Sequence, residues 1–387
     1  MIILHTSDWH LGKNLYDFVL LDDQQIMIDT IIDLCAGQKV DAVLLSGDIY
    51  DRPVPSNAAT QLYDYFLSKV VGHMGIPVIA IAGNHDSAGR LEFGSALYKT
   101  SGYYIYGRPQ KDVTPVVLRD PFGEVAFFPI PYLHPADVRV LFDDPGIKTF
   151  DSAYHVLMAH NEEYIDNGRR NIALAHGFFS NLSDAVDKTL ITSDSEVSIG
   201  GMDIADAACF SRFDYTALGH LHAPQWTIAQ KMRYAGSPLK YSLSEERQHK
   251  SVTVIDLRDK GRLSFNETPL IPKRNVRVIR GTFDALSAPA SHADGHFDDY
   301  VFAEISGDTV TYPMEKLRVL FPNILGLAFT DATEYRPDIK MTAQHGRLPI
   351  EDLFTRFYRD MKGEDIPADR LALLRDCIAG LEKEADN

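Results

Sequence analysis

The chain has 387 residues, of which 45% are hydrophobic, so it is long enough for one large domain and one or two small ones with buried cores. No apolar stretch approaches the roughly 18–20 residues that cross a bilayer, and the opening MIILHTSDWH lacks the regions of a signal peptide. A net charge of −16, from 38 basic and 54 acidic residues, argues against a protein that coats DNA through a broad basic surface.

The first two thirds of the chain alternate short apolar runs with longer amphipathic segments, which is the pattern of an α/β domain. Helices are expected around residues 22–36 and 56–71, between the first three runs. Later strands around 232–235 and 251–257 fit the same sheets. The six runs that predict the main strands are Ile2–His5, Ala42–Leu45, Val78–Ile81, Val125–Phe128, Ile172–Ala175 and Tyr215–Leu218.

A smaller unit begins near residue 270, where two prolines precede the segment Lys273–Arg280. It holds strand-like segments at 275–281 and 300–307 and a helix around 313–321. Its basic side chains allow two interpretations, a solvated strand edge or a contact to the DNA backbone, and the sequence does not separate them. They are Lys273, Arg274, Arg277 and Arg280.

The C-terminal part differs again in composition. Residues 331–347 have few apolar side chains and no clear period, which is typical of a linker. Apolar residues then recur at helical spacing to the end of the chain. We therefore expect a domain at 1–270, a small α/β capping domain at 271–330, a linker at 331–347 and a helical segment at 348–387.

Five predicted strands end alike, with a small residue followed by a side chain that can bind metal. The carboxyl ends of strands in an open α/β sheet gather at one edge, where ligands bind. A glycine or serine before the ligand lets the chain turn sharply over that edge. The five motifs are LHTSDWH (4–10), LLSGD (44–48), IAGNHD (81–86), LAHG (174–177) and LGHLH (218–222).

These motifs supply seven candidate metal ligands. Asp8 and His10, like His220 and His222, are two residues apart, so in an extended chain both members of a pair face one side. Asp48 can bridge two cations through its two oxygens. Seven ligands are too many for one four-coordinate zinc, but they suit two divalent ions, and a set without thiolate favours Mn²⁺, Fe²⁺ or Zn²⁺. The candidates are Asp8, His10, Asp48, Asn84, His176, His220 and His222.

The combination of these motifs resembles the calcineurin-like metallophosphoesterase superfamily. The longer segments HTSDWHLGKN, GDIYDRPVPS, ALGHLHAPQ and YAGSPLKYSLSEE are similar, more narrowly, to the SbcD family of bacterial nuclease subunits, over residues 1–270. The resemblance implies a two-sheet metallophosphoesterase sandwich flanked by helices. The small α/β capping domain and the C-terminal helical segment would follow it.

The resemblance also implies a role for each site residue. One ion would be held by Asp8, His10, Asp48 and His222. The other would be held by Asp48, Asn84, His176 and His220, with Asp48 shared. His85 would face the scissile phosphate, where it protonates the leaving oxygen or stabilises the developing charge, and Asp51 would orient its imidazole. His85 could instead be a packed structural residue held by Asp51.

The expected function is Mn²⁺-dependent hydrolysis of DNA by a metal-bound hydroxide, as an exonuclease on duplex ends and an endonuclease on hairpins or single strands. Two ligand carboxylates and two divalent ions leave a local charge of about +2, which offsets the acidic balance at the chemistry. The remaining affinity for DNA would come from a partner protein. Because the chain has no GxxxxGK[ST] loop, any dependence on ATP must come from elsewhere.

The family implies two protein partners. A homodimer would form through the helices around 56–71 and 90–98. An SbcC-like ATPase would bind the C-terminal helices, with Leu353, Phe357, Leu374 and Ile378 as anchors. Three distant cysteines predict reduced thiols rather than a disulfide framework, and we expect a cytoplasmic, nucleoid-associated protein with no membrane contact.

Two other functions stay open. A phosphatase or phosphodiesterase acting on small nucleotides or phosphoproteins would use the same metals, although it does not need the extra domain or the helical tail. A non-catalytic DNA-end scaffold would not need an intact ligand set together with His85. His160 is the nearest decoy of His176, but it lies in the polar segment HNEEY without a following glycine.

Overall fold

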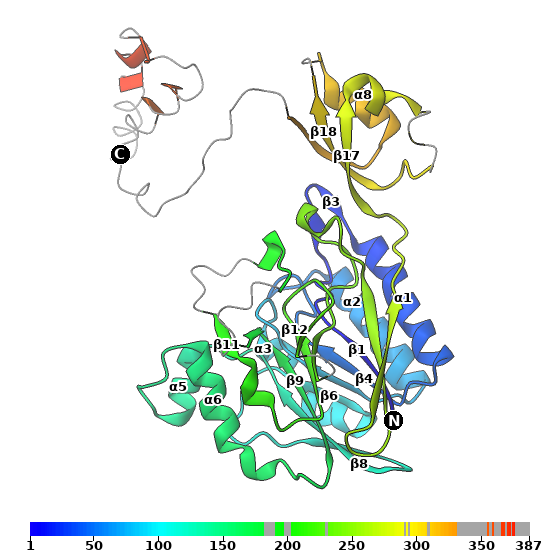
Figure 1. The fold of residues 1–387 in the computed structure, drawn as a ribbon, viewed down its shortest axis with the longest axis vertical. Helices are drawn as coiled ribbons and strands as arrows, with labels where there is room; N and C mark the ends of the chain where they lie inside the picture. The colour runs from blue at the N-terminus through cyan, green and yellow to red at the C-terminus, as the bar shows by residue number, and fades with distance from the viewer. Residues whose placement is uncertain are drawn as a thin grey trace. The chain divides into compact units, whose positions relative to one another are not determined.

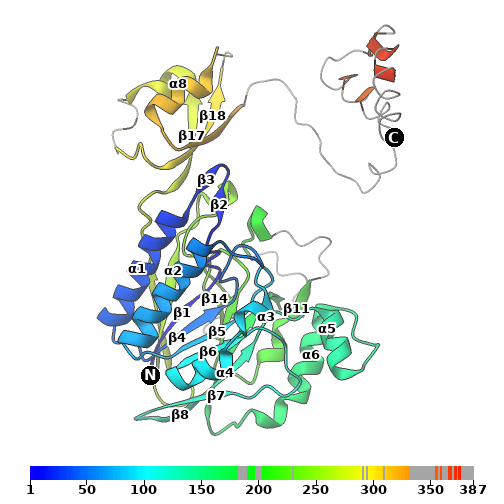
Figure 2. The same cartoon turned by 180° about the vertical axis from the view of Figure 1, so that it is seen from behind.

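The computed structural model describes residues 1–181, 190–196, 203–228, 231–289, 292, 295–307 and 310–330, and short stretches at 354–355, 358–359, 365–367, 370–372 and 374–375. Contacts between residues divide the chain into a compact unit Met1–Ala328 and a second unit Phe329–Asn387. Within the described part of the first unit, two six-stranded sheets face each other, and a three-stranded sheet follows them (Figures 1 and 2).

The first large sheet has the strand order β16-β15-β1-β4-β5-β6. The four strands from β1 to β6 in this order are parallel, β15 pairs antiparallel with β1, and β16 pairs antiparallel with β15. Runs such as AVLLS and VIAI are buried along their whole length, as expected for parallel strands covered on both faces. The strands are β1 (Ile2–Thr6), β4 (Ala42–Ser46), β5 (Val78–Ile81), β6 (Tyr103–Tyr106), β15 (Ser251–Leu257) and β16 (Leu263–Pro269).

The second large sheet has the order β13-β14-β12-β9-β8-β7. Its four central strands are parallel and its edge strands β13 and β7 are antiparallel to their neighbours. The strands are β7 (Val116–Asp120), β8 (Gly123–Ile130), β9 (Arg170–His176), β12 (Tyr215–Gly219), β13 (Gln225–Ile228) and β14 (Met232–Tyr234).

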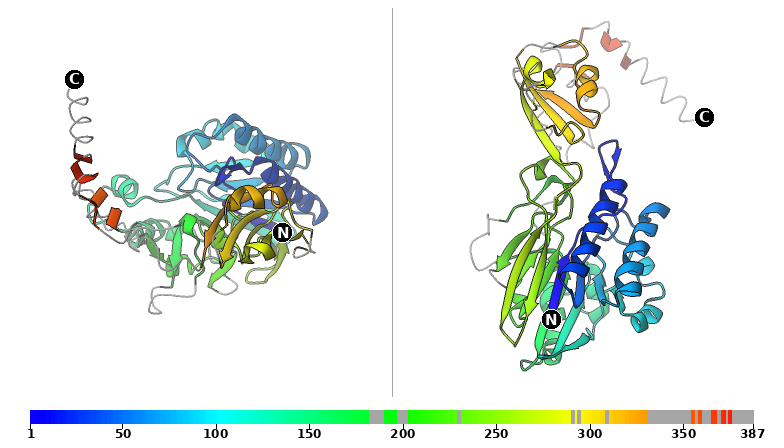
Figure 3. Two further views of the ribbon diagram at one scale, coloured as in Figure 1. Left: turned by 90° about the horizontal axis from the view of Figure 1, so that it is seen from above. Right: turned by 90° about the vertical axis from the view of Figure 1, so that its right-hand side faces the viewer.

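Three hydrophobic clusters hold these layers together. One lies between the sheets and includes Ile3, Phe127 and Leu174. The others lie where α1 and α2 cover the first sheet and where α5 and α6 cover the second (Figures 1 and 3). The chain therefore forms the two-sheet α/β sandwich flanked by helices that was expected. The helices are α1 (Leu21–Gly37), α2 (Asn57–Leu67) with a π-helical turn (Ser68–His73), α3 (Ala88–Leu91), α4 (Ser95–Tyr98), α5 (Pro135–Phe142) and α6 (Phe150–His160).

Shorter elements decorate the sandwich. Two-stranded sheets pair β2 (Asn14–Leu15) with β3 (Phe18–Val19) and β10 (Phe178–Ser180) with β11 (Ile204–Asp206). The 3₁₀ turns are Lys99–Ser101, Glu162–Tyr164, Asp194–Glu196, Ala207–Phe210 and Leu243–Glu245. Among the residues described, no helix combines the length and apolar character needed to cross a membrane.

The three-stranded sheet after residue 270 has the order β17-β18-β19. The parallel pair β17 and β18 buries Tyr300 and Ile305, and Leu317 and Phe321 pack from the helical side. The two predicted strands and the helix are present, and α7 and the third strand are additional. The elements are β17 (Val276–Thr282), α7 (Phe283–Ser287), β18 (Tyr300–Ser306), α8 (Pro313–Leu320) and β19 (Ile324–Phe329).

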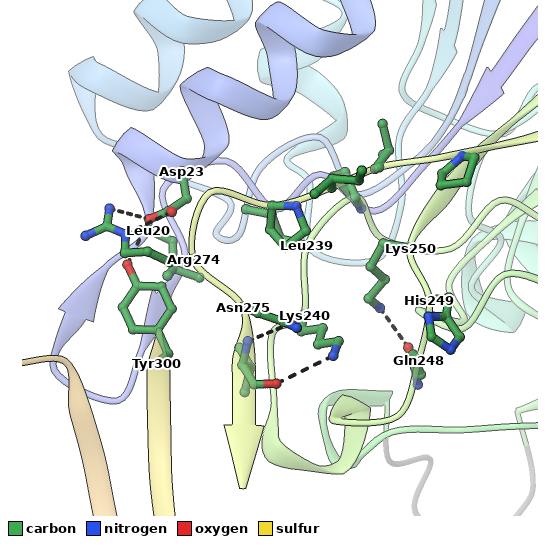
Figure 4. A pocket seen from close by; sticks show the side chains of 16 residues that line it. Leu20, Asp23, Leu239, Lys240, Gln248, His249, Lys250, Arg274, Asn275 and Tyr300 are labelled. Carbon is green, nitrogen blue, oxygen red and sulfur yellow. Dashed lines mark hydrogen bonds and ion pairs between the residues drawn. The ribbon is translucent and has the colours of Figure 1, made fainter. Parts of the chain in front are cut away.

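The basic segment at the start of this sheet is paired with carboxylates. Both oxygens of Asp23 on α1 accept from the Arg274 guanidinium, at 3.0 and 2.6 Å, and one accepts from the Tyr300 hydroxyl at 2.8 Å (Figure 4). The other pairs join Arg277 to Asp299 at 2.7 Å and Arg280 to Glu246 and Glu304 at 3.0 and 2.8 Å. The structure therefore favours a structural role for these three arginines over a contact to DNA phosphates.

The predicted strands and the two N-terminal helices are all present, with ends shifted by a few residues. The sequence analysis did not find the edge strands β6, β7, β13 and β16 or the helices α5 and α6. Strands β7, β13 and β16 are half-exposed, and β6 and α5 have only four and eight residues, so their apolar periodicity is weak. The expected linker 331–347 lies outside the described residues.

Candidate metal centre

The candidate ligands lie at the carboxyl ends of five parallel strands of the two sheets. Asp8, Asp48 and Asn84 follow β1, β4 and β5 in the first sheet. His176 is the last residue of β9, and His220 and His222 follow β12 in the second sheet. His176 on β9 pairs with Gly219 on β12, so His176 and His220 lie at the same height along the second sheet.

The loops that carry the aspartates are not extended. Asp8, His10 and Asp48 have φ angles of 53°, 45° and 50°, in the left-handed region, where a residue with a Cβ is strained by about 1–3 kcal/mol. The expectation that Asp8 and His10 share a side because the chain is extended is therefore wrong. A tight turn brings them together instead, and its strain must be offset by the surrounding core.

One group of ligands gathers around His10. Oxygen or ring nitrogen atoms of Asp8, His10 and His222 all lie within 4.8 Å of one another. His10 Nε2 lies 3.2 Å from His222 Nε2 and 3.6 Å from Asp48 Oδ2. These contacts match the four residues expected for the first ion.

The second group gathers around Asn84. Its Oδ1 lies 3.0 Å from His176 Nε2 and 3.1 Å from His220 Nδ1. His176 Nε2 is also 3.4 Å from Asp48 Oδ2, so one oxygen of Asp48 faces both groups. The other oxygen, Oδ1, accepts from the His85 amide at 2.9 Å. Oδ2 is therefore the oxygen of Asp48 that lies near both groups, whereas a bridge through both oxygens of Asp48 was expected.

The tautomers of two histidines make the site a set of acceptors. His176 Nδ1 lies 2.8 Å from the Ser46 carbonyl, and His222 Nδ1 lies 3.0 Å from Glu245 Oε1. Carbonyl and carboxylate oxygens only accept, so both Nδ1 atoms donate and both Nε2 atoms of the neutral rings carry lone pairs. When the rings are neutral, these Nε2 lone pairs face other nitrogen and oxygen atoms at 3.0–3.4 Å, and either a proton or a metal ion between the atoms removes the repulsion. The donor set therefore fits divalent metal ions.

Burial governs the protonation of these groups. Burial raises the pKa of Asp8 to about 6, although His176 and His222 act in the opposite direction. Burial and the nearby His176 lower the pKa of His220 to about 3. Burial opposes a charge on His176 as well, but Asp48 outweighs it and raises that pKa to about 9. A positive charge beside Asp48 is therefore favoured, and a metal ion would displace the His176 proton.

His85 lies beside both groups and lines a cavity of about 230 Å³ together with Asp48, Asn84 and His220. Its Nδ1 is 3.0 Å from the main-chain carbonyl of Asp51. The Asp51 carboxylate lies near both His10 and His85, with an oxygen within 4.8 Å of a ring nitrogen of each. It accepts from Lys13 at 2.7 Å and lies 3.7 Å from His10 Nδ1, whereas the hydrogen bond to the His85 ring comes from the backbone of Asp51.

Comparison with known proteins agrees with this geometry. Residues 1–224 match the family described as calcineurin-like phosphoesterase, which is more than half of the chain. The chain belongs to the calcineurin-like phosphoesterases. Proteins of this family use divalent metal ions, as the donor set indicates. Residues 272–362 match a second family, described as type 5 capsule protein repressor C-terminal domain.

Two relatives of this phosphoesterase are named as the SbcD subunit of the nuclease SbcCD. The protein from Staphylococcus saprophyticus is 30% identical over 99% of both chains. The one from Staphylococcus epidermidis is 31% identical over 95% of both chains. Among solved structures, the protein TT1561 of Thermus thermophilus aligns with a TM-score of 0.40 and 13% identity, over 69% of this chain and 98% of that one.

The phosphoesterase site also uses carboxylates that the sequence analysis did not assign. Asp86 accepts main-chain N–H groups of Ile49, Tyr50 and Gly83 at 3.1, 3.0 and 2.9 Å, which joins the loops after β4 and β5. Glu196 accepts from the His222 amide, and Glu245 from its ring. Asp86 and Glu245 stand in quoted motifs, whereas Glu196 has no local signal.

Glycines allow close contacts beneath the ligands of the phosphoesterase, between the two sheets at Gly219 and between the loops after β4 and β5 at Gly83. A Cβ on Gly219 would lie 2.0 Å from the Ser46 carbonyl oxygen, and the same oxygen accepts a hydrogen bond from His176 Nδ1. A Cβ on Gly83 would lie 2.2 Å from Asp48 Oδ1. Any side chain at these positions forces the backbone that carries a ligand to move.

The substitution Gly219→Ala should therefore weaken metal binding about tenfold or more, because a shift of about 1 Å is enough to spoil such a site. Binding of Mn²⁺ can be measured by titration calorimetry. Gly37→Ala is the matched control, since a Cβ there meets nothing within 4 Å and its Mn²⁺ affinity should not change. Equal affinities for the two variants would contradict the close contact at Gly219.

Proposed function

We propose that the chain is a metal-dependent DNA nuclease that hydrolyses phosphodiester bonds. The observation that carries this proposal is the convergence of acceptor atoms from seven side chains beside a cavity that His85 lines. The two relatives named as SbcD subunits of the nuclease SbcCD support the choice of substrate, because they align along 95–99% of both chains. Exonuclease action on duplex ends and endonuclease action on hairpins or single strands belong to the proposal.

The ions that we propose are two Mn²⁺. Imidazole, carboxylate and amide donors without thiolate suit a borderline or hard divalent ion. When bound, the two ions would supply Lewis acidity and an activated water for attack on phosphorus. One would be held by Asp8, His10, Asp48 and His222, and the other by Asp48, Asn84, His176 and His220.

The proposed role of His85 is to protonate the leaving oxygen. Its Nδ1 donates to the Asp51 carbonyl, so Nε2 is the nitrogen available to the cavity. Protonated at Nε2, the ring would donate to the leaving oxygen as the bond to phosphorus breaks. We propose that Asp51 holds His85 through its carbonyl and stands beside His10 through its carboxylate.

The substitution His85→Ala should lower the rate of DNA cleavage by about 10²–10⁴-fold, the range for loss of a general acid, while two Mn²⁺ still bind. A nuclease assay and calorimetry measure the two quantities. His160→Ala is the control, because that ring is partly exposed and pairs with Asp112 at 2.8 Å, outside the metal centre. Unchanged cleavage by His85→Ala would remove His85 from the mechanism.

The proposal includes an SbcC-like ATPase as partner, bound through residues 348–387. The net charge of −16 weakens the affinity of the chain for DNA, which supports a partner that adds DNA-binding contacts. Of the four anchors expected there, Leu374 is helical and half-buried, and Leu353, Phe357 and Ile378 lie outside the described residues. The domain division at 270, 330 and 347 is also part of the proposal. The second family match, which starts at residue 272, supports the boundary near 270.

Substrate choice provides the main test. With Mn²⁺, the full chain together with its ATPase partner should cleave linear duplex DNA in preference to a small phosphomonoester. Asp48→Ala should abolish cleavage, because Asp48 Oδ2 faces both ligand groups, and this control excludes a contaminating nuclease. Preference for the monoester would indicate a small-substrate phosphatase. Binding of DNA ends without cleavage would indicate a scaffold.

A homodimer is also part of the proposal. α2 and the segment that carries α3 and α4 line an open apolar groove of about 640 Å³. Phe93 and Val54 line it and are 80% and 67% exposed, and Leu97, next to the lining residue Tyr98 on α4, is 75% exposed. Large apolar side chains gathered in water mark a protein contact. A second copy of the chain is the occupant we propose, because the family resemblance places dimerisation on these same helices.

The double variant Phe93→Asp/Leu97→Asp should be monomeric, because carboxylates buried without partners at the contact cost several kcal/mol. Multi-angle light scattering measures the mass. Val140→Asp is the control, since Val140 is 82% exposed on α5, away from this groove, and its mass should equal that of the unaltered chain. A monomeric unaltered chain would contradict the homodimer, and a dimeric double variant would contradict this surface.

A further inference from the structure

His222 is held at three points by groups outside the candidate ligand set. Its ring Nδ1 donates to Glu245 Oε1 at 3.0 Å. Its carbonyl oxygen accepts from Lys250 Nζ at 2.9 Å, and its amide donates to Glu196. The ring orientation and the backbone of this one ligand are therefore both restrained.

Glu245 and Lys250 form a buried ion pair. Glu245 is 0% exposed, the Lys250 side chain is 3% exposed, and Nζ lies 2.6 Å from Glu245 Oε2. Lys250 Nζ also lies 2.8 Å from Ser237 Oγ and 2.7 Å from Gln248 Oε1, the contact that Figure 4 shows. The carboxylate thus has one oxygen on the imidazole and the other on the ammonium.

Stability alone does not explain this pair. Removing two charges from water costs several kcal/mol per ion, and apolar side chains of similar volume in such places are often as stable or more so. A buried pair does restrict geometry, however. Lys250 prevents the carboxylate from rotating, and the carboxylate keeps the His222 Nδ1 proton in place, so Nε2 stays directed at His10 Nε2, 3.2 Å away.

We propose that Glu245 and Lys250 are positioning residues for His222, which orient its imidazole and raise its basicity as a metal ligand. The pair reaches the ring by way of Glu245 and the backbone by way of Lys250. This inference rests on the proposed metal site. It concerns one ion of the two, because His222 groups with Asp8 and His10, whereas His220 contacts Asn84.

The experiment titrates the full chain with Mn²⁺ and follows the free ion by electron paramagnetic resonance, which counts the sites and their affinities. Glu245→Gln is nearly isosteric and can no longer accept from both the imidazole and the ammonium. It should weaken one of the two Mn²⁺ sites about 10–100-fold and leave the other unchanged, as expected for a group behind a ligand. Cleavage by this variant should recover at high Mn²⁺ concentration.

Glu246→Gln is the matched control. Glu246 is the next residue in the chain, but its carboxylate pairs with Arg280 at 3.0 Å instead of a candidate ligand. Both of its Mn²⁺ affinities should stay unchanged. Lys250→Met provides a second variant, which removes the ammonium but leaves Glu245 and should also weaken one site only.

The outcomes separate this inference from the proposed function. No Mn²⁺ bound by the unaltered chain would overturn both. Two bound ions with no change in Glu245→Gln, or an equal loss at both sites, would overturn the positioning role alone. If near-ultraviolet circular dichroism showed that Glu245→Gln and Lys250→Met both fail to fold, the pair would be structural and the inference would be wrong.

Discussion

Nitrogen and oxygen atoms of the candidate ligands lie crowded and buried at one edge of the two sheets. Positive charge must lie among these atoms, and the surrounding structure holds them in this arrangement. His10 Nε2 lies 3.2 Å from His222 Nε2, and Asp48 Oδ2 lies within 3.6 Å of one ring on each side. Burial disfavours the charged forms of Asp8 and His220, while Asp48 favours a positive charge on His176. Divalent cations, which proteins of this family use, would supply positive charge at this edge.

The sandwich supplies the rigidity that such crowding needs. The ligands stand on parallel strands whose neighbours are fully buried. Gly219 lets the two sheets approach where a Cβ would collide, and Gly83 does the same for the loops after β4 and β5. The left-handed residues Asp8, His10 and Asp48 store strain at the same edge. Strain of this kind persists only where a packed core holds it, and the cluster beneath α1 and α2 does so here, because it includes the flanking residues Trp9, Leu11 and Ile49.

Carboxylates on neighbouring loops orient the candidate ligands and the loops that carry them. Asp86 joins the loops after β4 and β5, and Glu245 sets the ring of His222. Farther out, Asp23 on α1 pairs with Arg274, which ties the basic segment to the phosphoesterase. Gln24, the next residue, donates to the carbonyls of Trp9 and His10, so the start of α1 contacts both the basic segment and a ligand loop.

The sequence by itself determined the layered α/β fold and the candidate ligands, because buried parallel strands are apolar runs and their ligands follow them within a few residues. The tertiary structure alone decided which oxygen of Asp48 faces both groups, that Asp51 holds His85 through its carbonyl, and that Glu245 stands behind His222. It also decided that Arg274, Arg277 and Arg280 pair internally. These contacts join residues 22 to 251 positions apart, and the packing of separate loops sets such distances, whereas local periodicity reports only which face of an element is apolar.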